Sequence, residues 1–154
     1  MTPLEFSDSI HVAVPPETLY AMVSDVTRTG EWSPVCRECW WDDGAGPQVG
    51  SWFTGRNVTP QREWETRSRV VAADAGREFA WEVNDGWVRW GFTLEPEDAG
   101  TRLTESWNFL ERGIAGFHER FGAKAEAEIA ARSDAALSGI PATLAAIKAA
   151  AESA

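Results

Sequence analysis

Glu105 is the strongest candidate for a catalytic or ligand-binding group, because it is a carboxylate within a stretch of alternating apolar residues. The residues in phase with it at every second position are Leu103, Trp107 and Phe109, and the intervening positions are polar. In a β-strand this pattern places the apolar set and Glu105 on one inward face. An unpaired charge there is costly. Glu105 therefore either meets a cation or hydrogen-bond donor, or its pKa rises and it serves as an acid or a ligand anchor.

Aromatic and small polar residues on the neighbouring stretches fall in the same phase. Nine tryptophans offer about 150–250 Å² of surface each, more than a core of this size needs, so we expect some of them to line a space rather than fill one. The predicted ligand-binding residues are Trp41, Phe53, Asn57, Trp64, Thr66, Ser68, Phe79, Trp81, Trp90 and Trp107. The amide and the two hydroxyls would orient a ligand. The alternative for these three side chains is hydrogen bonding to nearby backbone.

Cys36 and Cys39 form a CxxC pair within a predicted strand. Residues three apart in a strand point to opposite faces, and the two histidines, His11 and His118, are isolated, so we expect two reduced thiols and no metal site. His118 lies in the glycine-punctuated segment 113–122 and is a second candidate for acid–base work; the alternative is an exposed histidine. No phosphate-binding or dinucleotide-binding glycine motif occurs, and we expect no cofactor.

Alternation and turn residues predict the elements that hold these side chains. Seven stretches alternate as strands do: 6–14, 36–42, 50–58, 62–73, 77–83, 87–94 and 101–109. Two short helices, 16–24 and 25–32, are predicted between the first and second strands. The alanine-rich segment 123–151 predicts one long helix with an apolar stripe. Consecutive strands joined by short turns indicate an antiparallel sheet, here laid against the terminal helix in an α+β fold.

Composition limits the classes of partner. The chain of 154 residues carries a net charge of −10, which disfavours nucleic acid and anionic membrane surfaces. There is no apolar run long enough to insert into a membrane and no secretory signal, so we expect a cytoplasmic protein with a single domain over residues 1–154. Small molecules or other proteins remain as partners, and both a monomer and a homodimer are open.

The order of elements and several motifs resemble the START-like (SRPBCC) helix-grip superfamily, in particular its polyketide cyclase/dehydrase branch. The segments that carry the resemblance are Ala13–Glu17, Val23–Asp25, Glu31–Pro34, Val49–Asn57 and Gly100–Trp107. The resemblance implies a curved seven-stranded antiparallel sheet wrapped around the C-terminal helix, with a cavity between them. It also implies either carriers of hydrophobic ligands or aromatase/cyclases, because the superfamily includes both.

We therefore expect a hydrophobic, aromatic or polycyclic small molecule to bind in an internal cavity. If the protein is an enzyme, the resemblance points to cyclisation, dehydration or aromatisation of a poly-β-keto chain, with Glu105 moving protons. One alternative is a non-catalytic carrier or chaperone for a lipid, quinone or pigment. Another is a protein-interaction module.

Overall fold

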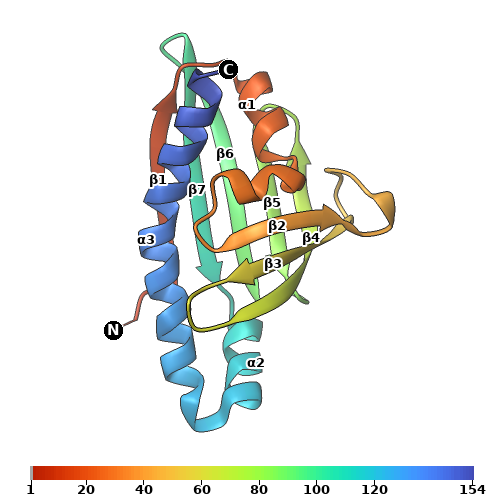
Figure 1. The fold of residues 1–154 in the computed structure, drawn as a ribbon, viewed down its shortest axis with the longest axis vertical. Coiled ribbons are helices and arrows are strands. Elements are labelled where there is room, and N and C mark those ends of the chain that lie inside the picture. The colour runs from red at the N-terminus through yellow and green to blue at the C-terminus, as the bar shows by residue number, and fades with distance from the viewer. Residues whose placement is uncertain (1) are drawn as a thin grey trace.

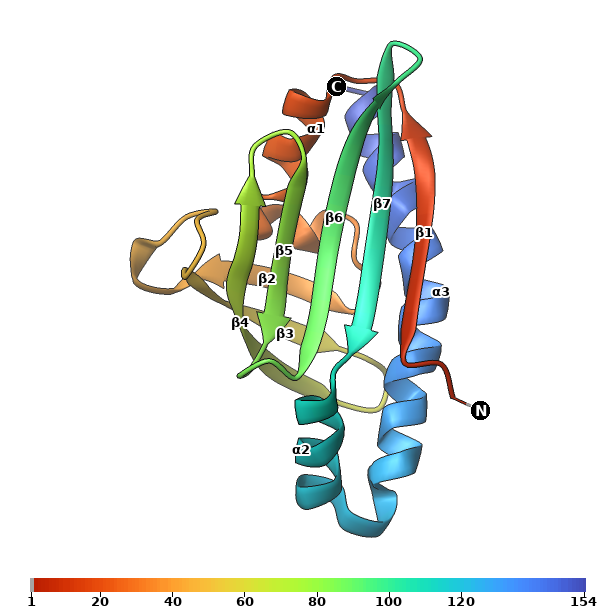
Figure 2. The ribbon, with the colours of Figure 1, turned by 180° about the vertical axis from the view of Figure 1, so that it is seen from behind.

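The computed structural model describes residues 2–154 as one antiparallel sheet with helices around it (Figures 1 and 2). The strands are β1 (Glu5–Val12), β2 (Cys36–Trp41), β3 (Trp52–Val58), β4 (Glu63–Asp74), β5 (Glu78–Val83), β6 (Val88–Glu97) and β7 (Gly100–Phe109). The α-helices are α1 (Pro16–Val23), α2 (Glu111–Phe121) and α3 (Ala125–Glu152), and the 3₁₀ turns are η1 (Val26–Glu31), η2 (Asp42–Gly44) and η3 (Gly122–Lys124).

The strand order β1-β7-β6-β5-β4-β3-β2 places the first strand beside the last, and every neighbouring pair is antiparallel. Each of the remaining connections joins strands that are adjacent along the chain. Between β5 and β6, Asn84 (φ 56°) and Gly86 (φ 73°) take the left-handed conformation that asparagine and glycine tolerate. The predicted α+β class is confirmed, with its seven antiparallel strands, two short helices after the first strand and long C-terminal helix.

The sheet is strongly curved. In Figure 1, β2 and β3 cross the view while β1, β6 and β7 run along its length. The ladder slips by one residue at two places, between Cys36 and Glu38 in β2 and between Val70 and Ala72 in β4. Bulges of this kind increase local twist and bend a strand. They help the β2 end of the sheet to turn across the long axis of the molecule.

Helix α3 runs along β1 and β7 in both views (Figures 1 and 2). Its buried residues follow helical spacing: Ala125, Ile129, Ser133, Ala136, Ile140, Thr143, Leu144, Ile147 and Ala151. The last turn is also fastened to the end of β1. Lys148 Nζ donates to the His11 carbonyl at 2.8 Å, and Glu152 accepts from the Ala13 amide at 2.9 Å. Apolar burial and these bonds together fix the helix against the sheet edge.

Helix α2 is a departure from the sequence-based expectation. Gly113 and Gly116 lower helix propensity, and the sequence predicts no helix between residues 113 and 122. In the structure both glycines lie against Trp87: a Cβ on Gly113 would clash with the Trp87 carbonyl, and one on Gly116 with its indole ring. The glycines therefore permit close packing of a helix on this tryptophan. None of the helices in the described part of the chain is long and apolar enough to cross a bilayer.

Candidate functional site

Glu105 lies inward on β7, as the alternation predicts. Its neighbours across the sheet are Asp8 on β1 and Phe92 on β6, and Leu103 and Trp107 flank it along the strand. The side chain is 5% exposed, and its Oε1 atom has no hydrogen-bond partner. Burial raises the pKa of Glu105 to about 8 because the charged form loses its water. Glu105 is therefore mostly a neutral carboxylic acid near pH 7, able to donate a hydrogen bond or a proton.

Ser133 on α3 is a second buried polar group without a partner. It is completely buried, and its Oγ makes no hydrogen bond. Helical serines commonly bond the carbonyl four residues back, and this one does not. Since α3 packs against β7, each of the two facing layers contributes one unpaired polar atom. Buried polar atoms without a hydrogen-bond partner are rare in folded proteins and need an explanation. A bound ligand with a polar group is one such explanation.

Sequence reasoning passed over Ser133. It lies in an alanine-rich helix, where the residue type serine does not by itself indicate a functional position. The signal was its spacing, because Ile129, Ser133, Ala136 and Ile140 follow one another at intervals of four, three and four residues, which places the serine on the buried stripe.

The strand registers place the ten predicted ligand-binding residues on the inner face together with Glu105. One row crosses the sheet as Trp107, Trp90, Trp81 and Val70, and the next as Phe109, Val88, Val83, Ser68, Phe53 and Trp41. The rings pack edge to face or tilted, as Phe53 does on Trp41 at 5.5 Å and on Trp81 at 6.0 Å between centroids. Phe79 and Trp107 are fully buried, whereas Trp41, Trp81 and Trp90 are only half-buried. Part of the indole surface thus remains open to a guest.

The polar members of the set lie at the β3–β4 side of this face. Asn57 Nδ2 donates to Thr66 Oγ1 at 3.2 Å and to the Trp64 carbonyl at 3.4 Å. Ser68 is buried one position further along β4 on the same face. Strands β5 and β6 separate this group from Glu105 on β7. The structure therefore holds two polar regions, an Asn57–Thr66 pair already bonded to each other and an unpaired Glu105.

Trp64 is covered by charged side chains. The Arg62 guanidinium lies 4.5 Å from the centre of its ring and that of Arg132 lies 5.7 Å away. Glu128 on α3 bonds Arg132 at 2.8 Å and pairs with Arg62 at 3.5 Å. We call these four residues the Trp64 clasp. It joins the β3–β4 turn to the long helix at one margin of the inner face.

His118 lies on the exposed face of α2, away from the buried inner residues. It makes no side-chain hydrogen bond or ion pair among the interactions found in residues 2–154. The structure does not bring it together with Glu105.

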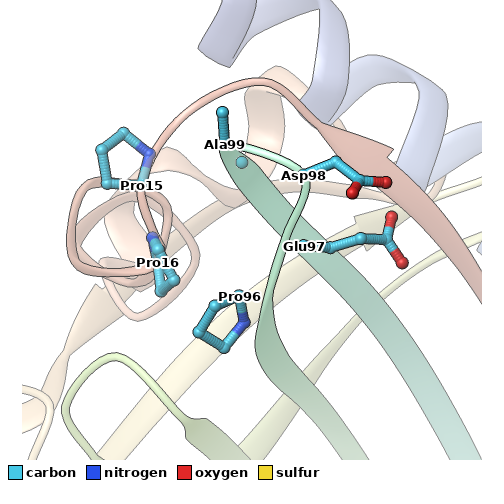
Figure 3. A pocket seen from close by; sticks show the side chains of 7 residues that line it. Pro15, Pro16, Pro96, Glu97, Asp98 and Ala99 are labelled. Atoms are coloured by element: carbon cyan, nitrogen blue, oxygen red, sulfur yellow. The ribbon is translucent and has the colours of Figure 1, made fainter.

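Two hollows in residues 2–154 lie elsewhere. One, of about 460 Å³, is lined by Pro15, Pro16 and the 96–100 turn (Figure 3). The other, of about 660 Å³, lies beside it between the start of α1, the 74–78 turn and the end of β6. None of the ten predicted ligand-binding residues lines either hollow. Both hollows are therefore distinct from the inner face that the sequence predicts to bind a ligand.

The expectation that Cys36 and Cys39 point to opposite faces is wrong. Cys39 pairs with Gly55 and Cys36 with Asn57, two residues that share the inner face, because the bulge at Glu38 inserts one extra residue between the cysteines. Their sulfur atoms lie 3.1 Å apart. No cluster of three or more metal-ligating side chains occurs within residues 2–154.

A curved antiparallel sheet closed against a long C-terminal helix is the helix-grip arrangement. Residues 3–152 match the family model described as polyketide cyclase/dehydrase and lipid transport, and the chain belongs to that family. A polyketide-cyclase-like protein from Corynebacterium glutamicum, solved by solution NMR, is 56% identical, with a TM-score of 0.71 over 97% of this chain and 91% of its own.

More distant solved structures share the fold. The di-domain ARO/CYC StfQ from the steffimycin biosynthetic pathway is 16% identical, with a TM-score of 0.70 over 97% of this chain and 51% of its own. A protein from Nitrosomonas europaea is 16% identical, with a TM-score of 0.64 over 95% and 92% of the two chains. Comparison with curated proteins gave no match.

Proposed function

We propose that the protein binds a hydrophobic, aromatic or polycyclic small molecule between the inner face of the sheet and α3. The observation that carries this proposal is the unpaired Oε1 of Glu105, buried on the same face of the sheet as the half-buried Trp81 and Trp90. A ligand oxygen that accepts a hydrogen bond from the neutral carboxyl would satisfy it. The unpaired Ser133 hydroxyl on the facing helix offers a second polar contact.

Aromatic burial supplies the driving force in this proposal. A ligand that removes about 200 Å² of apolar surface from water gains about 5 kcal/mol before the costs of association are subtracted. Trp81 and Trp90 present flat ring surface that suits a fused-ring guest. The neutral carboxyl then fixes the orientation, since a single hydrogen bond of this kind contributes about 1 kcal/mol.

The test is quenching of tryptophan emission by two probes of different chemistry, 1,8-dihydroxyanthraquinone and palmitic acid. We expect the anthraquinone to bind, Glu105→Ala to weaken its binding about fivefold, and Glu105→Gln, which keeps a donor, to weaken it much less. Thr104→Ala, on the opposite face of the same strand, is the matched control. Absence of binding by both probes, or equal affinity in wild type and Glu105→Ala, would overturn the proposal.

Catalysis is the more specific form of the same proposal, and the raised pKa of Glu105 favours it. A carboxyl that keeps its proton near pH 7 can protonate a leaving hydroxyl during dehydration of a cyclised poly-β-keto chain. With such a substrate, Glu105→Gln would abolish turnover and preserve binding. A carrier for a lipid would instead prefer palmitic acid, show no turnover, and lose little on either substitution.

A further inference from the structure

The pair Cys36 and Cys39 occupies a site that the ligand-binding proposal does not use. The two sulfur atoms approach to 3.1 Å over the backbone of Gly55. A Cβ at residue 55 would lie 3.3 Å from the Cys36 sulfur and 3.2 Å from the Cys39 sulfur, which is tighter than ordinary contact. Glycine at this position therefore leaves the room in which the two thiols meet.

Access to the pair is unequal. Cys36 is half-buried and keeps part of its surface open, whereas Cys39 is buried. Cys36 Sγ also lies 3.5 Å from the Glu38 carbonyl, on the bulge itself. A small oxidant can thus reach the pair at Cys36. Each thiol meets the other cysteine of the pair more readily than a cysteine of another molecule, because the two sulfur atoms are already 3.1 Å apart.

The proton is shared unevenly between the two thiols. Hydrogen bonding with Cys36 lowers the pKa of Cys39, and hydrogen bonding with the Thr29 side chain acts in the same direction. The bond to Cys39 raises the pKa of Cys36. The contact thus places a proton between the two sulfur atoms, and the sulfur that accepts it is the one that more readily becomes a thiolate.

We propose that Cys36 and Cys39 form a reversible internal disulfide when the protein meets a hydroperoxide. The geometry carries this inference, because the sulfur atoms need to approach by only about 1 Å to reach bonding distance. The bulge that places both side chains on the inner face and the absence of a side chain at Gly55 are the two features that allow it.

The reaction balances with hydrogen peroxide as the only co-reactant. The thiolate of one cysteine of the pair attacks one peroxide oxygen, the O–O bond breaks, and the departing hydroxide takes up a proton to leave as water. The resulting sulfenic acid is attacked by the sulfur of the other cysteine, which loses its proton while the S–O bond breaks and a second water leaves. Two thiols and one peroxide give one disulfide and two waters, and a dithiol reductant reverses the change.

The experiment treats the full reduced chain with hydrogen peroxide and then titrates its thiols under denaturing conditions. We expect the count to fall from two to none per chain, the intact mass to drop by two hydrogen atoms, and dithiothreitol to restore both. Peptide mapping should place the link between Cys36 and Cys39 and separate it from methionine oxidation. Disulfide-linked dimers, stable oxygen adducts, or two thiols that persist would each overturn the inference.

Three variants test the geometry. Cys36→Ser and Cys39→Ser each leave one thiol and should form no internal disulfide, only a sulfenic acid or a disulfide between two chains. Gly55→Ala keeps both thiols but inserts a methyl group between them, and we expect it to slow internal disulfide formation several-fold. Far-ultraviolet circular dichroism verifies that this variant is folded. An unchanged rate in folded Gly55→Ala would contradict the role given to the glycine.

Discussion

At the scale of single residues, Glu105 is the group whose environment is most at odds with its chemistry. A carboxylate normally remains in water or meets a cation, and Glu105 does neither. The folded protein accommodates it by keeping it protonated, since burial is the cause of its raised pKa. The cost of this arrangement depends on pH, which makes it measurable without any ligand.

We predict that stability falls as pH rises from about 5 to about 8. Between 4.5 and about 8 the folded carboxyl keeps its proton while the unfolded one releases it, so each rise in pH favours the unfolded chain. Across that window the loss approaches about 5 kcal/mol, and below pH 4.5 or well above pH 8 this group adds no further slope. Urea unfolding at a series of pH values measures it.

Glu105→Gln isolates this contribution because glutamine does not titrate. The variant should show a flatter dependence than wild type over the same range, and the two curves should diverge most above pH 8. Carboxylates paired at the surface, such as Glu97 with Arg102, have lowered pKa values and act below this window. Parallel curves for the two proteins would show that Glu105 is ionised in the folded state.

At the scale of elements, the Trp64 clasp connects a turn of the sheet to α3. Each of its interactions is partly exposed, so each contributes little to global stability. Together they hold the β3–β4 turn at one margin of the inner face. This is the kind of contact that controls local opening while leaving the global free energy of unfolding almost unchanged.

Glu128→Ala should therefore loosen the turn without unfolding the protein. The substitution removes both ion pairs of the clasp, and we expect amide hydrogen exchange over residues 59–62 to accelerate several-fold while the melting temperature changes little. Hydrogen exchange followed by mass spectrometry measures both regions at once. Glu126→Ala, exposed on the same helix turn, is the control; equal exchange in the two variants would mean that the clasp holds nothing.

Sequence reasoning succeeded at this scale wherever period-two alternation was unbroken. The burial of Glu105 follows from such a run in β7, which the structure matches residue for residue. Prediction from the sequence failed where a bulge inserts one extra residue into a strand, and where tertiary packing outweighs low helix propensity. The bulge at Glu38 reverses the expected face of Cys36, and contact with Trp87 accounts for the glycines of α2. Neither the bulge nor the Trp87 contact has a local signature in the sequence.

At the scale of the whole molecule, sheet and terminal helix depend on each other. The long helix packs mainly against β1 and β7 of the sheet and against α2, and its apolar stripe would be exposed to water without them. The last turn is bonded to the end of β1, the edge strand that in turn pairs with β7. These connections predict that residues 2–154 unfold as one cooperative unit, as expected of a single domain.

The distribution of tryptophan allows that prediction to be tested by two separate probes. All nine tryptophans lie between residues 32 and 107, so their fluorescence reports the sheet and its loops, whereas far-ultraviolet circular dichroism is dominated by α2 and α3. We expect the two signals to change at the same urea concentration.

Ile140→Ala, which leaves a cavity at a fully buried position on α3, should lower the free energy of unfolding by about 2–5 kcal/mol and move both curves together. Ser138→Ala, exposed on the same helix, should leave both in place. If the helix signal of Ile140→Ala were lost at a lower urea concentration than the fluorescence signal, α3 would unfold independently of the sheet. A ligand site between helix and sheet would then lack a stably packed helix on one side.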